Sequence, residues 1–208
     1  MSDKSNKYGY VGVDIPAQSF GNNKGVFNPA EINELVADNK WTFFGQLELI
    51  ETQTASSVSY LDFLDIKENI YNVHFMTFSN VIFGTSDTLG FQLYENGTLE
   101  TGSVYQYATQ YGYASGSFGE DRTTAQTFLV TGNNNNTSQN GYIYGYNFGD
   151  STKYSFMTQH STNNETSYLM RFGSGVLPQA SVVNGIRHKG FSGNTFSGTF
   201  SLYGIRYS

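Results

Sequence analysis

The sequence predicts an all-β fold, an antiparallel β-sandwich of jelly-roll type, preceded by an extended N-terminal arm and one short helix. Composition is the first indication: the 208 residues include 16 Tyr, 17 Phe and 23 Gly, and 13 % are charged. Aromatic residues with abundant glycine favour short strands and turns. From Trp41 onward, turn signals recur at roughly 8–12-residue spacing, which is typical of sandwiches and barrels. No helical pattern follows Asn39, and this excludes folds built from helical crossovers.

Residues 1–27 are expected to form the arm. They contain four glycines and one proline and show no sustained hydrophobic period. Spaced aromatic side chains are costly to leave exposed, so we expect the arm to dock on a neighbouring molecule through Tyr8, Tyr10, Phe20 and Phe27. The alternative is a frayed terminus.

A short helix is predicted over residues 29–38. Asn28 and Glu31 occupy capping-box positions, and Pro29 suits a first helical turn. The apolar stripe that follows would have to pack against other residues, and we expect it to form a lid on the next domain. Trp41, the single tryptophan, is expected to anchor the junction and to take part in docking. The predicted division is therefore an arm over 1–27, a helix and junction over 28–40, and a sandwich over 41–208.

The sandwich region is read as a series of strands joined by turns. TFFGQLELIETQTASSVSYLDFLDI predicts two strands around a Ser/Thr turn, and both faces of YNVHFMTFSNVIF carry apolar residues. Asn96-Gly97 is the pair that a two-residue primed hairpin turn prefers, and a second hairpin is predicted at Gly149-Asp150. Residues 111–122 and 132–140 are Gly- or Asn-rich and polar, so we expect outward-facing loops there. The remaining predicted strands are TFLVTG, SYLMRFGS, VVNGIRHKGF and TFSGTFSLYGIRY.

Two segments resemble structural proteins of tailed phages, especially those of marine cyanobacteria. One is the opening YGYVGVDIPAQSF with GVFNPAEINELVADNKW. The other runs from Asn184-Gly185-Ile186-Arg187 and Phe191 through Ser192-Gly193-Asn194 to SGTFSLYGIRYS. In those proteins such a C-terminal segment forms the last pair of strands of a jelly-roll-like module. In its final strand, Gly204 is expected either to admit a close backbone or aromatic ring or to mark a bulge.

The resemblance implies a non-enzymatic virion protein, a capsid decoration or tail-associated subunit, made in the host cytoplasm. Its expected partners are other capsid or tail proteins and further copies of itself, with a trimer as the first expectation. Residues 1–120 carry 5 basic and 14 acidic side chains, a net −9, and residues 121–208 carry 6 and 3, a net +3. This asymmetry would suit head-to-tail contacts; the favoured alternative is that the charges simply lie in solvated loops.

The residues suggest no catalytic chemistry and no cofactor. His74, His160 and His188 are far apart and lack metal-binding spacing, and His74 is interpreted as a strand-surface side chain. The carboxylate groups, interpreted as solvated turns, are Asp62 with Asp65 and Glu68, and Glu120 with Asp121. Cysteine is absent, which excludes disulfides and thiolate metal sites.

The remaining function classes are few. A net charge of −6 disfavours nucleic-acid binding. No apolar run approaches a membrane span and none resembles a signal peptide, so we expect no membrane insertion. The alternative to a virion subunit is a carbohydrate-binding module or a host-receptor-binding tail protein that contacts a host-surface glycan.

Clustered tyrosines are the basis of this alternative. By parity Tyr142, Tyr144 and Tyr146 share one face of a strand and form the best candidate sugar-stacking set. Weaker candidates of the same kind are Tyr105, Tyr107, Tyr111 and Tyr113. Ordinary cross-strand pairing is the competing explanation for all of them.

Overall fold

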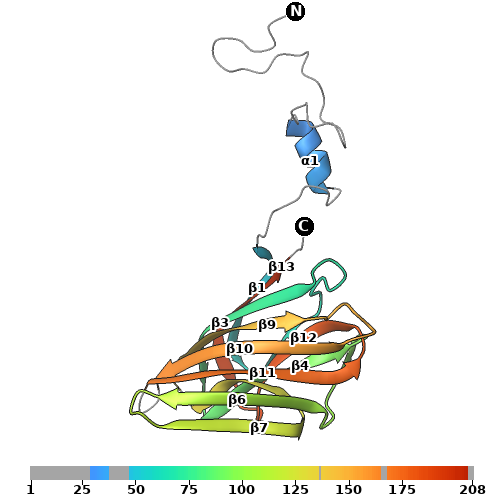
Figure 1. Ribbon diagram of the computed structural model, residues 1–208. Coiled ribbons are helices and arrows are strands. Elements are labelled where there is room, and N and C mark those ends of the chain that lie inside the picture. Colours follow the sequence, from blue (N-terminus) through green and yellow to red (C-terminus); the bar gives the residue numbers. More distant parts are fainter. Residues whose placement is uncertain (1–28, 38–46, 136, 165–167, 206–208) are drawn as a thin grey trace, which may run out of the picture. The chain divides into compact units, whose positions relative to one another are not determined.

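The computed structural model describes residues 29–37, 47–135, 137–164 and 168–205 (Figure 1). The chain divides into two compact units, Met1–Phe43 and Phe44–Ser208. In the first unit, α1 spans Pro29–Ala37, which confirms the predicted helix to within one residue. None of its side chains is buried, and its role as a lid stays a prediction, as does the three-part division of the chain. The predicted docking residues lie outside the described residues: Tyr8, Tyr10, Phe20, Phe27 and Trp41.

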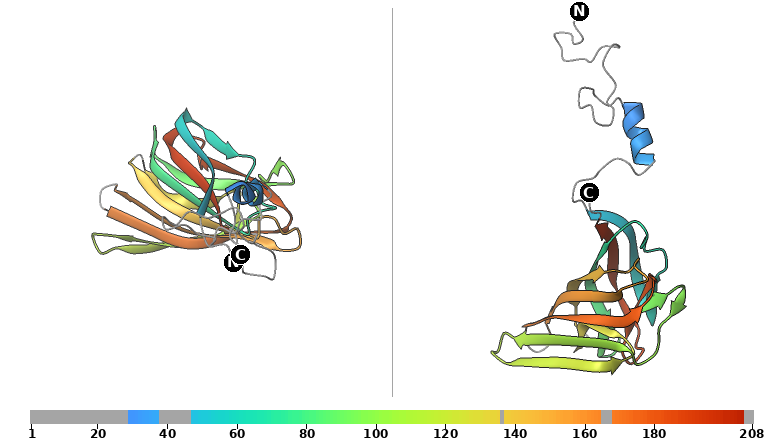
Figure 2. Two further views of the ribbon diagram at one scale, coloured as in Figure 1. Left: turned by 90° about the horizontal axis from the view of Figure 1, so that it is seen from above. Right: turned by 45° about the vertical axis from the view of Figure 1, so that its right-hand side comes forward.

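The second unit is a sandwich of two antiparallel sheets, as predicted (Figure 2). The larger sheet has eight strands, in the order β1 (Leu47–Val58), β13 (Phe196–Ile205), β3 (Val73–Phe83), β9 (Gln139–Tyr146), β10 (Tyr154–Asn164), β11 (Tyr168–Ala180), β6 (Tyr105–Tyr113) and β7 (Phe118–Gln126). The smaller sheet has five strands, β2 (Tyr60–Phe63), β12 (Val183–Gly190), β4 (Asp87–Glu95), β5 (Thr98–Leu99) and β8 (Leu129–Asn135), the last two both pairing with β4.

The core lies between the two sheets and follows the two-residue period of the strands. On β3, His74, Met76 and Phe78 are buried, whereas Phe75 and Thr77 turn to the other face and are half-buried. Aromatic side chains dominate the interior. Those less than 2 % exposed include Phe63, Phe83, Phe91, Phe148, Phe196 and Phe200.

Turn chemistry explains several of the connections. Asn96 and Gly97 have φ angles of 49° and 83°, which both central residues of the predicted primed turn require. The second predicted hairpin joins β9 to β10, where Asp150 donates its backbone N–H to the carbonyl of Asn147 at 3.1 Å. The two strands predicted around the Ser/Thr turn are β1 and β2, but they enter different sheets.

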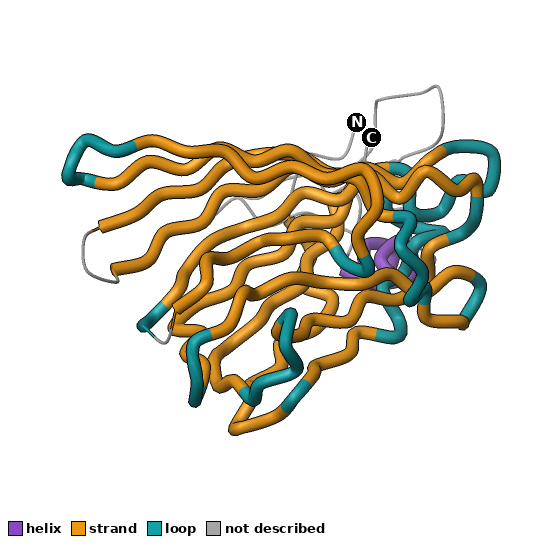
Figure 3. Tube along the Cα trace, turned by 90° about the horizontal axis from the view of Figure 1, so that it is seen from below, coloured by secondary structure: helices purple, strands orange, loops and turns teal. Residues whose placement is uncertain are grey.

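The two predicted loops are largely strand (Figure 3). Residues 111–122 belong mostly to the β6–β7 hairpin, in which Gly112 pairs with Phe118. Strand β7 is the last strand at its edge of the sheet, and between Phe118 and Ala125 it is polar on both faces, so it lacks the apolar alternation that reveals a strand. In the second segment, β8 runs to Asn135 and β9 begins at Gln139.

The loop between β12 and β13 is organised around the carboxylate of Asp87, a β4 side chain only 2 % exposed. Its oxygens accept backbone N–H hydrogen bonds from Thr88 at 2.8 Å, Ser192 at 3.0 Å and Asn194 at 3.1 Å. The Ser192-Gly193-Asn194 motif singled out in the sequence is therefore the part of the loop that wraps this acid.

Candidate binding face of the eight-stranded sheet

The face of the eight-stranded sheet that is turned away from the smaller sheet, called here the outer face, carries a cluster of aromatic side chains. Tyr142, Tyr144 and Tyr146 all lie on it, as parity predicted, together with Phe75 and Tyr203. The ring of Phe75 lies at the centre of this aromatic patch. Its centroid is 4.7 Å from Tyr144, 5.9 Å from Tyr142 and 6.0 Å from Tyr203.

Strand register brings these rings together. Phe75 is paired with Tyr144 on β9 on one side and with Tyr203 on β13 on the other. Such aromatic cross-strand pairs contribute about 0.5–1.5 kcal/mol beyond their buried area. Cross-strand pairing thus accounts for part of the patch, yet Tyr142 remains 39 % exposed and presents ring surface to solvent.

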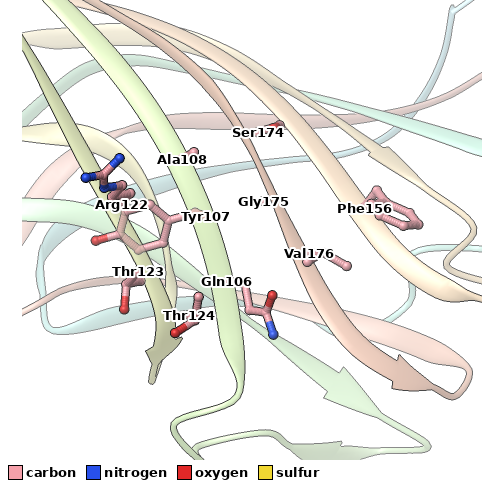
Figure 4. Close-up of a pocket in the computed structure, with 10 residues that line it drawn as sticks. All are labelled: Gln106, Tyr107, Ala108, Arg122, Thr123, Thr124, Phe156, Ser174, Gly175 and Val176. Atoms are coloured by element: carbon pink, nitrogen blue, oxygen red, sulfur yellow. The ribbon is translucent and has the colours of Figure 1, made fainter.

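Beside the patch, short side chains follow one another across the sheet. In register with Tyr144 come Thr158 on β10, Ser174 on β11, Ala108 on β6 and finally Arg122 on β7. These short residues leave a depression, called here the trough. Figure 4 shows Ser174 and Ala108 between Phe156 on one side and Arg122 on the other.

The trough consists of two hollows that share Ala108 and Arg122. The larger, about 630 Å³, is bordered by Phe156 and Val176. The smaller, about 300 Å³, is bordered by Phe172. Phe156 and Phe172 are each 45 % exposed, so the trough has an apolar wall on either side.

Polar groups alternate with these apolar walls. The linings of the two hollows include Gln106, Thr124 and Gln110, whose amide and hydroxyl groups donate and accept hydrogen bonds. The charged side chains of these linings are Arg122 and Glu120, which form an ion pair at 3.3 Å. The described lining of the trough therefore carries no net charge.

A further hollow of about 370 Å³ lies at the aromatic patch. It is bordered by Phe75, Tyr142 and His160, with Asn140 and Thr162 among its polar residues. The His160 ring is 5.8 Å from Tyr142 in an edge-on arrangement. Hollows and exposed rings thus extend across the outer face from β3 to β7.

The weaker tyrosine candidates on β6 do not lie on the outer face. Tyr105 and Tyr107 are buried toward the smaller sheet. The Tyr107 hydroxyl donates to Asp121 at 3.4 Å, and burial raises the pKa of Tyr107 to about 12. Tyr111 shares their side of the strand and lies 5.2 Å below the Arg171 guanidinium. The rings of Tyr105 and Tyr107 belong to the interior, and the expectation that they could stack on sugars is wrong for these two residues.

His74 is not the strand-surface residue expected from the sequence. It is fully buried, its Nε2 is 2.8 Å from the Ile66 carbonyl oxygen, and its ring stacks on Phe148 at 5.2 Å. Burial lowers the pKa of His74 to about 4. Val73 and Phe75 alternate with His74 and are apolar, so the two-residue period predicts that they face the core and His74 faces solvent, whereas it is Phe75 that is half-buried on the other face.

Three of the carboxylates interpreted as solvated turns are strand residues with partners: Glu120 pairs with Arg122 on its own strand, and Asp62 and Asp121 pair with arginines of other strands. Asp62 lies on β2 and accepts two hydrogen bonds of 2.7 Å from Arg187. Asp121 lies on β7 and accepts from Arg171 at 3.3 Å. Both partners come from distant strands, which no local pattern could indicate. Among the described residues, no three His, Asp or Glu side chains are grouped so as to hold a metal ion.

Comparisons with known proteins do not assign a family. No protein-family model matches the sequence, and no curated protein is similar to it. Among solved structures, a mutant of the alginate lyase Aly36B in complex with an alginate trisaccharide is similar over 75 % of this chain and 88 % of that one, at 11 % identity and a TM-score of 0.26. This likeness is too low to carry an argument about function. In the part of the chain that the structure describes, no helix has the length and apolar character of a membrane span.

Proposed function

We propose that this protein is a non-enzymatic accessory subunit of a tailed-phage particle, attached to the capsid or tail through its N-terminal arm and through contacts of the sandwich. The observation that supports this most directly is where the phage-like C-terminal motif lies. The motif forms β13, which is paired on both sides within the large sheet, and the loop wrapped around Asp87. The residues that resemble phage proteins are therefore ones that form the framework of the sandwich.

The form of the chain favours an accessory subunit over a fibre. A fibre shaft needs coiled-coil heptads or repetitive β-structure. No internal repeat is visible in the sequence, and α1 has nine residues. A single sandwich with an arm suits a decoration protein that covers joints between capsid subunits, or a small tail-attached piece.

The arm and the uneven charge suggest how copies would assemble. An extended arm of residues 1–27 would span about 80 Å, enough to cross a neighbouring subunit. The net charges of the two parts of the chain, −9 and +3, would favour heterologous contacts that close into a ring. A trimer is the first expectation.

Mass spectrometry of purified particles, followed by immunogold labelling, tests the proposal. We expect the protein in the particles, with gold on heads for a decoration role and on tails for attachment. Deletion of residues 1–27 should leave a folded sandwich that is missing from the particles. Absence of the full-length protein from purified virions would refute the structural role and leave a free carbohydrate-binding module as the alternative. Normal occupancy of the truncated protein would show that the arm is dispensable.

A further inference from the structure

The trough is long enough to hold a short chain of rings. From Thr158 on β10 to Arg122 on β7 the row crosses four neighbouring strands, a span of about 14 Å at the usual strand spacing. Phe156 on one side and Phe172 on the other leave the short side chains Ser174 and Ala108 between them. A ligand seated there would run across the strands rather than along them.

The backbone below the trough cannot take up a peptide as an added strand. Strands β10, β11 and β6 each have a hydrogen-bonded neighbour on both sides, so their amide and carbonyl groups are already used by the ladder. A strand-like peptide ligand would need an open edge. Recognition on this face therefore depends on side chains alone.

The side chains match the two kinds of surface that a sugar ring presents. Exposed rings at Phe156 and Phe172 offer flat apolar area to its C–H faces. Gln106, Gln110 and Thr124 border the same hollows and offer donors and acceptors to its hydroxyl groups. This mixture of flat rings and short polar groups fits a saccharide better than it fits the apolar centre of a protein interface.

The charges on the outer face argue against a polyanion. Arg122 is paired with Glu120 at 3.3 Å, and the remaining side chains lining the two hollows are uncharged. Binding of an acidic polymer would call for several unpaired cations.

We propose that the trough binds a linear, uncharged polysaccharide, which lies across β10, β11, β6 and β7 and stacks on Phe156 and Phe172. This assigns a ligand that the particle role does not require, and it can be tested on the isolated protein.

Affinity electrophoresis of the purified full-length chain provides the test. The gels contain, one at a time, barley β-glucan, soluble xylan, galactomannan or dextran, with alginate at the same mass concentration as the acidic comparison. We expect retardation by at least one neutral polymer and not by alginate. Replacing either wall, by Phe156→Ala or Phe172→Ala, should weaken this binding about tenfold, the equivalent of 1.4 kcal/mol.

A filling variant and a matched control separate the trough from the rest of the face. Ala108→Phe removes no contact but occupies the floor, and we expect it to abolish retardation. Tyr168→Ala removes an aromatic ring that is 51 % exposed on the same face, beyond the trough on β11, and should leave binding within about twofold. Thermal unfolding must show that each variant keeps the wild-type midpoint. If Ala108→Phe lowers the unfolding midpoint, the test of the trough rests on Phe156→Ala and Phe172→Ala instead.

Three outcomes would overturn the inference. The first is no retardation by any of the four neutral polymers. The second is binding that Phe156→Ala and Phe172→Ala leave intact. The third is retardation by alginate that exceeds that by every neutral polymer and weakens with added salt, which would replace the uncharged ligand with an acidic one. None of these results depends on whether the protein is found in particles.

Discussion

The ring of Tyr71 occupies the space in which any residue other than glycine at position 204 would place its Cβ. A Cβ at Gly204 would lie 2.2 Å from Cγ of Tyr71. Tyr71 is buried, and its hydroxyl donates a hydrogen bond to Glu48 at 2.6 Å. Gly204 itself stays paired with both Glu48 and His74. Of the two roles expected for this glycine, close approach of an aromatic ring is confirmed and a bulge is not.

Gly204→Ala is therefore expected to lower the free energy of unfolding by about 2 kcal/mol, because an added methyl group overpacks a filled site. Urea unfolding monitored by fluorescence measures the change. Gly84→Ala is the matched control, since the nearest atom to its added Cβ is the Thr195 hydroxyl oxygen at 3.6 Å, and it should cost much less. Equal losses for the two variants would contradict the role assigned to Tyr71.

Asp87→Asn is expected to destabilise the β12–β13 loop. The amide keeps the size of the side chain but replaces one acceptor oxygen with a donor that faces the N–H groups of Ser192 or Asn194. Losing a charge-assisted hydrogen bond costs about 1.5–3 kcal/mol, and denaturant unfolding should show a loss in that range. Asp65→Asn, at a side chain 74 % exposed, is the control with little expected effect. Hydrogen exchange should also speed up at the backbone amides of 192 and 194.

Two ion pairs should differ sharply in their contribution to stability. Arg187 donates two 2.7 Å hydrogen bonds to Asp62 and one of 2.8 Å to the Tyr94 hydroxyl, and the two charged side chains are 22 % and 18 % exposed. We expect Asp62→Asn to cost about 1–2 kcal/mol, discounted for the remaining solvent access. Glu120→Gln breaks a pair whose side chains are 57 % and 75 % exposed and should cost less than about 0.5 kcal/mol. Equal losses of unfolding free energy in Asp62→Asn and Glu120→Gln would contradict the view that geometry and burial set the strength of an ion pair.

His188 makes stability depend on pH. It is buried against Phe63, Phe91 and Phe200, and burial lowers the pKa of His188 to about 3. The unfolded chain binds the proton near the ordinary pKa of about 6.5, so stability falls as the pH drops from 6.5 toward 3. Between pH 7 and pH 5 this linkage amounts to about 2 kcal/mol.

His188→Leu removes this titration while keeping an apolar side chain of similar size. Urea unfolding at pH 7 and pH 5 should therefore show a pH dependence reduced by about 2 kcal/mol in the variant. His74 retains its own depressed pKa of about 4, so some dependence should persist. An unchanged difference between the two pH values would show that the pKa of His188 is the same in the folded and unfolded protein.

The features that the sequence predicted well are those encoded by neighbouring residues. The primed turn at Asn96-Gly97, the helix start at Pro29 and the common face of Tyr142, Tyr144 and Tyr146 each follow from local chemistry or from parity. The trough does not, because Phe156 and Phe172 face each other across it only through the register between strands. Their alternation with polar neighbours could have marked both rings as outward-facing, but not as two walls of one site.

The pairing of β1 with β13 has a consequence for synthesis on the ribosome. The hydroxyls of Thr52 and Ser201, 2.9 Å apart, belong to residues separated by 149 positions. Strand β1 emerges early, yet within the described strands its one hydrogen-bonded neighbour in the large sheet is β13, which is made more than 130 residues later. Contacts this distant in sequence slow folding. Strand β13 lies between β1 and β3, so neither can complete its pairing before β13 is made. A nascent chain stalled before residue 196 would expose two strand edges at once, so chaperones that cover these edges until β13 is available would favour correct folding.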